Sequence, residues 1–229
     1  MKWIAIGLAV VIAVAVGAWW YERYQADSAL QQQPVYRVLK QHERSLYDEL
    51  FEEYRVYQRG EEGPEKFINL ANSQISLAAT QRLVHASGSS VLALMHDMVG
   101  TAKKLEGKPE DACFRYWFPQ VLGPPDIAKF IEPGAQAHTL ELMGEVIRSA
   151  AEHPEPLPEP DAVKDNLANV INATYAQYGP DAQMLAHAED ARVDRSKVCT
   201  ITISVYDRIL ALQPRQAAEL IRAMTQVKK

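Results

Sequence analysis

The chain has 229 residues, of which 48% are hydrophobic and 23% are charged, and its net charge is −5 at pH 7. This composition is typical of an ordinary globular protein. Acidic and basic residues are interleaved along the chain and form no basic stripe, which argues against nucleic acid as a partner.

Residues 3–20 form an apolar run without a charged side chain, which predicts a transmembrane helix. At about 1.5 Å per residue the run extends about 27 Å, close to the thickness of a bilayer hydrocarbon core. Amphipathic aromatic side chains, which prefer the headgroup level, flank it: Trp3, Trp19, Trp20 and Tyr21. We therefore predict a retained signal anchor over 1–21, with the lipid bilayer as a partner through residues 3–20.

The alternative is a signal peptide cleaved near Ala18, where small residues offer a cutting site. That product would be secreted or periplasmic. We favour the retained anchor because the run is longer than the apolar core of a usual signal peptide. A very short tail before the run is typical of a chain whose large domain crosses the membrane. The predicted location is the bacterial inner membrane, single-pass, with the C-terminal domain in the periplasm.

The polar, glutamine-rich segment 22–34 reads as a stalk or a short continuation of the preceding helix. Apolar residues at helical spacing then predict one helix over 35–59, ended by Gly60. Pro64 suits the first turn of a second helix that runs to about residue 86. A third helix over 91–105 is expected to be capped by Ser89 or Ser90.

Segment 112–127 has no regular period and predicts a short helix followed by a structured loop. It holds the densest aromatic cluster after the anchor: Phe114, Tyr116, Trp117 and Phe118. We interpret the cluster as a plug of the core beside Cys113. The alternative is an exposed patch for a protein partner, because Trp and Tyr are frequent anchors at interfaces.

Helical spacing returns over 134–153, and the sequence PEPLPEP (154–160) then predicts an extended, semi-rigid crossover. Two further helices are expected, with Asp161 and Asp181 as their caps. Residues 198–205 fit both strand and helix spacing, and we predict helix because no other segment could pair with a lone strand. Pro214 is expected to open the last helix.

The chain has two cysteines, Cys113 and Cys199, and neither lies in a metal-binding or CxxC spacing. In an exported domain such a pair predicts one disulfide, although two unrelated buried thiols are the alternative. A loop of this length would stabilise the fold by about 4–5 kcal/mol in the chain-entropy model. Because the cysteines flank the Pro-rich crossover, we predict one domain over 35–229 rather than two.

No nucleophile elbow, phosphate loop or HExxH motif occurs in the sequence. His138 and Glu141 stand in the reverse order of a di-iron motif, and Glu49 with Glu53 matches an ordinary solvated helix face. We therefore predict no catalytic, cofactor-binding or metal-binding residue, and no cofactor.

The predicted fold is all-α: an irregular bundle of about seven or eight helices after an N-terminal transmembrane helix, with one disulfide. An anchored domain without a catalytic constellation is typical of a protein-interaction module in the bacterial envelope. It would serve as an accessory subunit of an envelope complex or as an immunity-type protein that neutralises a toxin. The alternatives are a periplasmic enzyme such as a cell-wall hydrolase, and a helical bundle that binds a small ligand.

Overall fold

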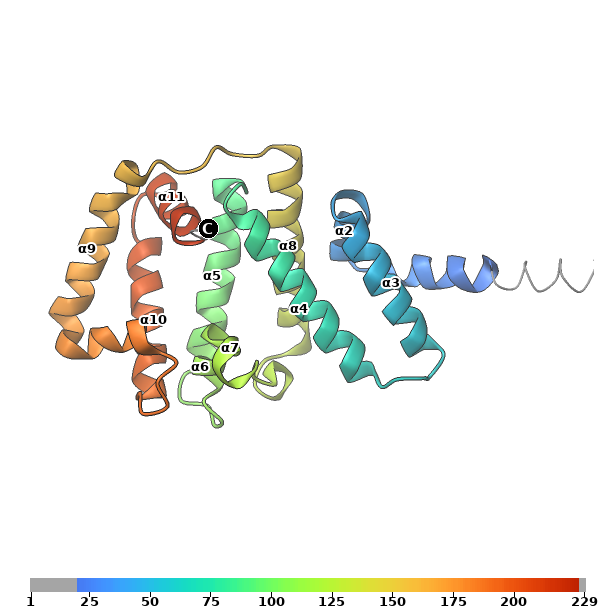
Figure 1. Cartoon of the computed structure of the whole chain (residues 1–229), viewed down its shortest axis with the longest axis horizontal. Coiled ribbons are helices and arrows are strands. Elements are labelled where there is room, and N and C mark those ends of the chain that lie inside the picture. The colour runs from blue at the N-terminus through green and yellow to red at the C-terminus, as the bar shows by residue number, and fades with distance from the viewer. Residues whose placement is uncertain (1–19, 227–229) are drawn as a thin grey trace, which may run out of the picture. The chain divides into compact units, whose positions relative to one another are not determined.

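The computed structural model describes residues 20–226, which form helices and connecting loops and contain no β-strand (Figure 1). The all-α prediction is therefore confirmed for this part of the chain. Contacts between residues divide the chain into two compact units, Met1–Ser76 and Leu77–Lys229. Each unit is described below by itself.

The described part of the first unit starts with a helix over 20–30, followed by α2 (Pro34–His42) and α3 (Arg44–Gln58). The single helix predicted over 35–59 is thus wrong: Glu43 leaves the helical region with φ −132° and ψ 57° and serves both helices as a cap. The break allows α2 and α3 to pack against each other. Leu39 and Leu50, which a straight helix would hold far apart, are both fully buried.

The loop after α3 contains Gly60 at φ 72°, the left-handed conformation expected of a helix-ending glycine. Helix α4 (Pro64–Leu83) then starts at the predicted proline and continues from the first unit into the second.

Helix α5 (Gly88–Leu105) is the centre of the second unit and contacts α6, α8, α10 and α11. Its buried side chains recur at helical spacing and include Leu94, Val99 and Leu105. The capping residue is Ser87, whose hydroxyl accepts a hydrogen bond from the Ser90 amide. The predicted cap, Ser89 or Ser90, therefore lies two or three residues after the observed one, because the helix already begins at Gly88.

The segment after α5 forms α6 (Ala112–Trp117), α7 (Pro119–Leu122) and the 3₁₀ helix η1 (Ile127–Lys129). A residue before proline is disfavoured in the helical conformation, and Phe118 accordingly adopts φ −126° and ends α6. Helix α8 (Pro133–Glu152) follows, close to its predicted bounds.

The last part of the second unit contains α9 (Pro160–Tyr178), the 3₁₀ helix η2 (Gly179–His187), α10 (Arg195–Leu210) and α11 (Pro214–Met224). Helix α10 confirms the helical interpretation of 198–205, and α11 begins at the predicted proline. Two caps were wrong: α9 is capped at Glu159, and Asp181 lies inside η2. The described residues hold eleven α-helices, the helix over 20–30 and α2 to α11, which is more than predicted, because the break at Glu43 divides one expected helix and α7 forms within an expected loop.

Candidate functional site

The first described helix exposes three aromatic side chains. Trp20, Tyr21 and Tyr24 are 64–70% exposed, which is unusual for aromatic groups of this size. Trp20 and Tyr21 are the last two residues of the predicted anchor, whereas residues 1–19, including Trp3 and Trp19, lie outside the described residues. No helix within residues 20–226 is long and apolar enough to cross a membrane.

Other side chains of the same helix are packed against the rest of the first unit. Ala26 and Leu30 are buried, and Asp27 accepts hydrogen bonds from Tyr47 Oη at 2.6 Å and from Lys40 Nζ at 2.7 Å. Burial of Asp27 raises the pKa of its carboxyl, but the bonds from Lys40 and Tyr47 outweigh this effect, and the net pKa is lowered. Burial and the neighbouring Asp27 carboxylate raise the pKa of Tyr47 above its ordinary value. The cluster holds the aromatic-bearing helix to α2 and α3.

Cations add a second attachment between this helix and α3. The Arg23 guanidinium lies 5.1 Å from the centre of the Phe51 ring and forms an ion pair with Glu52 at 2.9 Å. Arg55 approaches the same ring at 5.9 Å and the same carboxylate at 2.8 Å. Such cation–ring contacts stabilise by about 0.5–1 kcal/mol at exposed sites.

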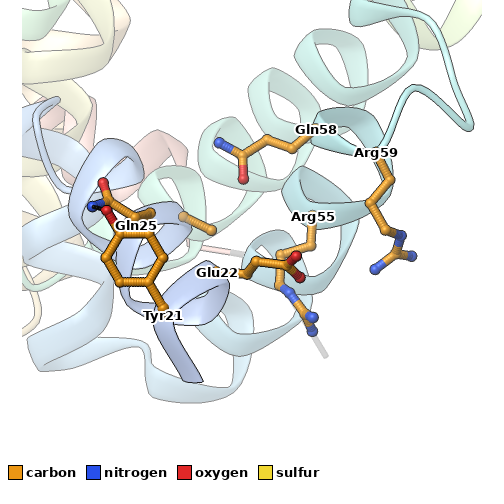
Figure 2. A pocket seen from close by; sticks show the side chains of 7 residues that line it. Tyr21, Glu22, Gln25, Arg55, Gln58 and Arg59 are labelled. Carbon is orange, nitrogen blue, oxygen red and sulfur yellow. Dashed lines mark hydrogen bonds between the residues drawn. The ribbon is translucent and has the colours of Figure 1, made fainter. Parts of the chain in front are cut away.

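A polar groove of about 440 Å³ lies between the first helix and α3 (Figure 2). Its lining carries both signs of charge together with side-chain amides and a phenol: Tyr21, Glu22, Gln25, Ala26, Arg55, Gln58 and Arg59. In Figure 2 the Glu22 carboxylate lies toward the guanidinium groups of Arg55 and Arg59. The guanidinium groups of Arg55 and Arg59 are also paired with Glu52 and Glu61, so the charges of the lining are partly balanced within the chain.

The second unit contains the predicted disulfide. Cys113 of α6 and Cys199 of α10 are bonded, with their Cα atoms 5.9 Å apart and a separation of 86 positions in sequence. Both are buried. The prediction that these two cysteines pair is confirmed.

The aromatic cluster beside the disulfide is buried or half-buried. Phe114 packs with Ala188 and Val198 in a local core, and Phe118 stacks on it at 5.1 Å between ring centres. Trp117 stacks on Tyr206 of α10 at 4.8 Å. This placement favours the interpretation of the cluster as a core plug, and Phe114, at 1% exposure, presents no surface to a partner.

Tyr116 contacts the edge of the Trp117 ring, and burial raises the pKa of its phenol, with a further increase from Asp97. The use of these aromatic residues as a partner patch stays a prediction.

An ion pair that the sequence analysis missed fixes the Pro-rich crossover. We call residues 154–159, between α8 and α9, the Pro-rich strap. Arg222 of α11 is only 3% exposed. Its guanidinium donates to the Glu155 carboxylate at 2.5 Å, to the Val84 carbonyl at 2.9 Å and to the Pro156 carbonyl.

The same strap is bound to the start of α5. The second Glu155 oxygen accepts a hydrogen bond from the Gly88 amide at 2.9 Å, at the positive end of the helix dipole. The Glu155 amide donates to the His85 carbonyl at 2.9 Å, and the His85 ring nitrogen Nδ1 lies 3.1 Å from the Glu155 carbonyl. One signal for this network exists in the sequence, because Arg222 stands one helical turn after the buried Ala218 on an otherwise apolar helix face.

Among residues 20–226 no group of three or more metal-ligating side chains comes together. Comparison with known proteins adds no assignment: no family model, no curated protein and no solved structure matches the chain.

Proposed function

We propose that this chain is a membrane-anchored, periplasm-facing protein-interaction domain of the bacterial envelope. The main support for the proposal comes from two consecutive features in the first 24 residues of the sequence given. An uncharged run over 3–20 is followed at once by a helix whose Trp20, Tyr21 and Tyr24 are exposed. Amphipathic aromatic groups at this position are typical of the headgroup level of a bilayer.

The packing of the first unit supports the same proposal. The aromatic-bearing helix is held by the Asp27 cluster and by Arg23 on Phe51. An anchor that continued into this helix would therefore be joined firmly to α2 and α3. The polar groove with Glu22, Arg55 and Arg59 begins one residue after the apolar run, where zwitterionic headgroups would lie.

The buried disulfide supports an extracytoplasmic location. Disulfides persist in oxidising compartments such as the periplasm and are rare in the reducing cytosol. The Cys113–Cys199 bond joins α6 to α10 inside the core of the second unit. Within the proposal, the helical body serves as an accessory subunit of an envelope complex or as an immunity-type protein.

Membrane fractionation of the full chain tests the proposal. The chain should stay in the membrane pellet after alkaline carbonate extraction, keep its N-terminal residues and be digested by protease added to spheroplasts. Ile12→Arg at the centre of the apolar run should release it, because an arginine there costs about 2.5–3.5 kcal/mol of insertion free energy. Arg37→Gln, in α2 outside the run, is the matched control. A soluble chain that begins near Trp19 would refute the anchor.

A further inference from the structure

The Pro-rich strap has one edge that faces the protein. A polyproline II segment has three residues per turn, so every third side chain points in the same direction. Glu159 has φ −69° and ψ 130°, within this conformation. Glu155 and Pro158 are three residues apart and face inward: Glu155 binds Arg222 and Gly88, and Pro158 is buried.

A second edge, displaced by one position, faces solvent. Pro154 and Leu157 of the strap and Pro160, the first residue of α9, follow one another at intervals of three, and all three are exposed. Leu157 is 53% exposed, which places a large aliphatic side chain between two prolines on an open surface. Figure 1 shows this segment running without helix from α8 to α9 along the side of the second unit.

The strap is already ordered before any partner arrives. Arg222 binds the Pro156 carbonyl and the Glu155 carboxylate, and Gln226 Nε2 lies 3.5 Å from the Pro158 carbonyl. Binding to a segment fixed in this way avoids the entropy loss of ordering a free chain. This is the advantage that polyproline II ligands give to the proteins that recognise them.

The chemistry of the edge defines the surface that would receive it. Proline and leucine side chains at intervals of three are received by grooves lined with aromatic residues. Glu159 and Asp161 are exposed beside the edge, so a groove with a basic rim would complement it. We propose that Pro154, Leu157 and Pro160 dock into an aromatic-lined, basic-rimmed groove of an envelope protein. This inference rests on the proposed interaction function and names the surface and the class of partner.

Photo-crosslinking of the full chain in living cells tests the inference. The photoreactive amino acid p-benzoylphenylalanine replaces Leu157 in one variant and Ile171 in a matched control, since Ile171 is an apolar α9 residue of similar exposure. The expected result is a protein adduct from position 157 whose crosslinked peptide maps to an aromatic-lined site of the partner. No such adduct is expected from position 171.

A second variant links the adduct to the edge itself. With the photoreactive residue moved to position 154, Leu157→Glu should reduce the adduct yield about tenfold or more, because a buried leucine contact is replaced by a charge. Thermal unfolding should be unchanged, since the Leu157 side chain is exposed.

The other possible crosslinking results separate the strap inference from the proposed interaction function. Adducts from position 171 alone would overturn the strap inference and leave the interaction function standing. Adducts from neither position would count against both. Adducts with lipid, or with a protein site that lacks aromatic residues, would overturn the strap inference, while carbonate extraction judges the anchor separately.

Discussion

Replacement of Arg222 by methionine would remove the guanidinium that holds the Pro-rich strap while it keeps most of the buried aliphatic stem. Three acceptors lose their donor: the Val84 carbonyl, the Pro156 carbonyl and one oxygen of Glu155. Arg222→Met is therefore expected to destabilise the second unit and to release the strap from α11.

The expected loss of folding free energy depends on how well water can replace the lost Arg222 donor at each acceptor. Pro156 is exposed, and Glu155 is 40% exposed and keeps its bond from the Gly88 amide, so water can satisfy both groups in part. The half-buried Val84 carbonyl would bear a cost of about 1–2 kcal/mol. With loss of the ion pair, discounted for exposure, the total is about 2–3 kcal/mol, below the roughly 3–5 kcal/mol of a fully buried pair.

Thermal unfolding of the full chain in detergent micelles, followed by circular dichroism, would measure the effect. For a unit of this size about 2–3 kcal/mol corresponds to a decrease in Tm of roughly 4–12 °C. Hydrogen exchange at the Glu155 amide should accelerate, because this amide bonds to the His85 carbonyl only while the strap is docked.

Arg215→Met is the matched control on the same helix. Arg215 is 90% exposed and pairs with Glu219, and loss of an exposed pair costs at most about 0.5 kcal/mol. If Arg222→Met lowered Tm no more than Arg215→Met, or left hydrogen exchange in the strap unchanged, the inference that the Arg222–Glu155 ion pair holds the strap in place would be refuted.

Three further outcomes are expected. Reduction, or joint replacement of Cys113 and Cys199 by alanine, should lower the free energy of unfolding by about 4–5 kcal/mol, as urea titration with and without reductant would show. The pKa of Asp27 is lowered on folding, so the ionised carboxyl contributes stability above its unfolded pKa near 4, and this contribution is lost as the pH falls through the lower folded pKa. Asp27→Asn should therefore lower the free energy of unfolding at pH 7 and make that free energy decline less steeply in acid. If the pH dependence of stability in acid were unchanged, the role of Asp27 in the cluster would be contradicted. Phe114→Ala should cost about 3–5 kcal/mol because the ring is fully buried, whereas Leu122→Ala at an exposed position of α7 should change Tm little.

Helix periodicity in the sequence located most of the fold. The starts of α4 and α11 were predicted because proline is well suited to the first helical turn. Residues 198–205 were predicted to be helical although their pattern also alternates like a strand. That prediction rested on the absence of a pairing partner, and helix α10 confirms it.

The break at Glu43 could not be predicted from local sequence. Residues 42–44 contain no glycine or proline, and the apolar spacing continues across them. The break depends on tertiary packing, because only a turn at this point allows Leu39 of α2 and Leu50 of α3 to be buried in one small unit. Intrinsic propensity is a weak guide where such packing decides.

The candidate site could likewise be predicted only in part from the sequence. The cysteine pair was predictable because two cysteines allow one bond, whereas the aromatic cluster remained open between core and surface until burial was known. The pairing of Arg222 with Glu155 joins positions 67 residues apart. Each residue type is common on helix surfaces and in loops, so its partner could be named only from the fold.

Two sets of contacts in the second unit join segments that lie on either side of the Pro-rich strap: the disulfide and the Arg222 network. The disulfide joins α6, before the strap, to α10 after it. The Arg222 network joins α11, at the end of the chain, to Glu155 and to Val84 before α5. Segments on both sides of the strap therefore share one core, and we expect the unit to unfold in a single transition. The same contacts hold Leu157 in a fixed position at the surface, so the residues that stabilise the crossover also determine which of its side chains are exposed to solvent.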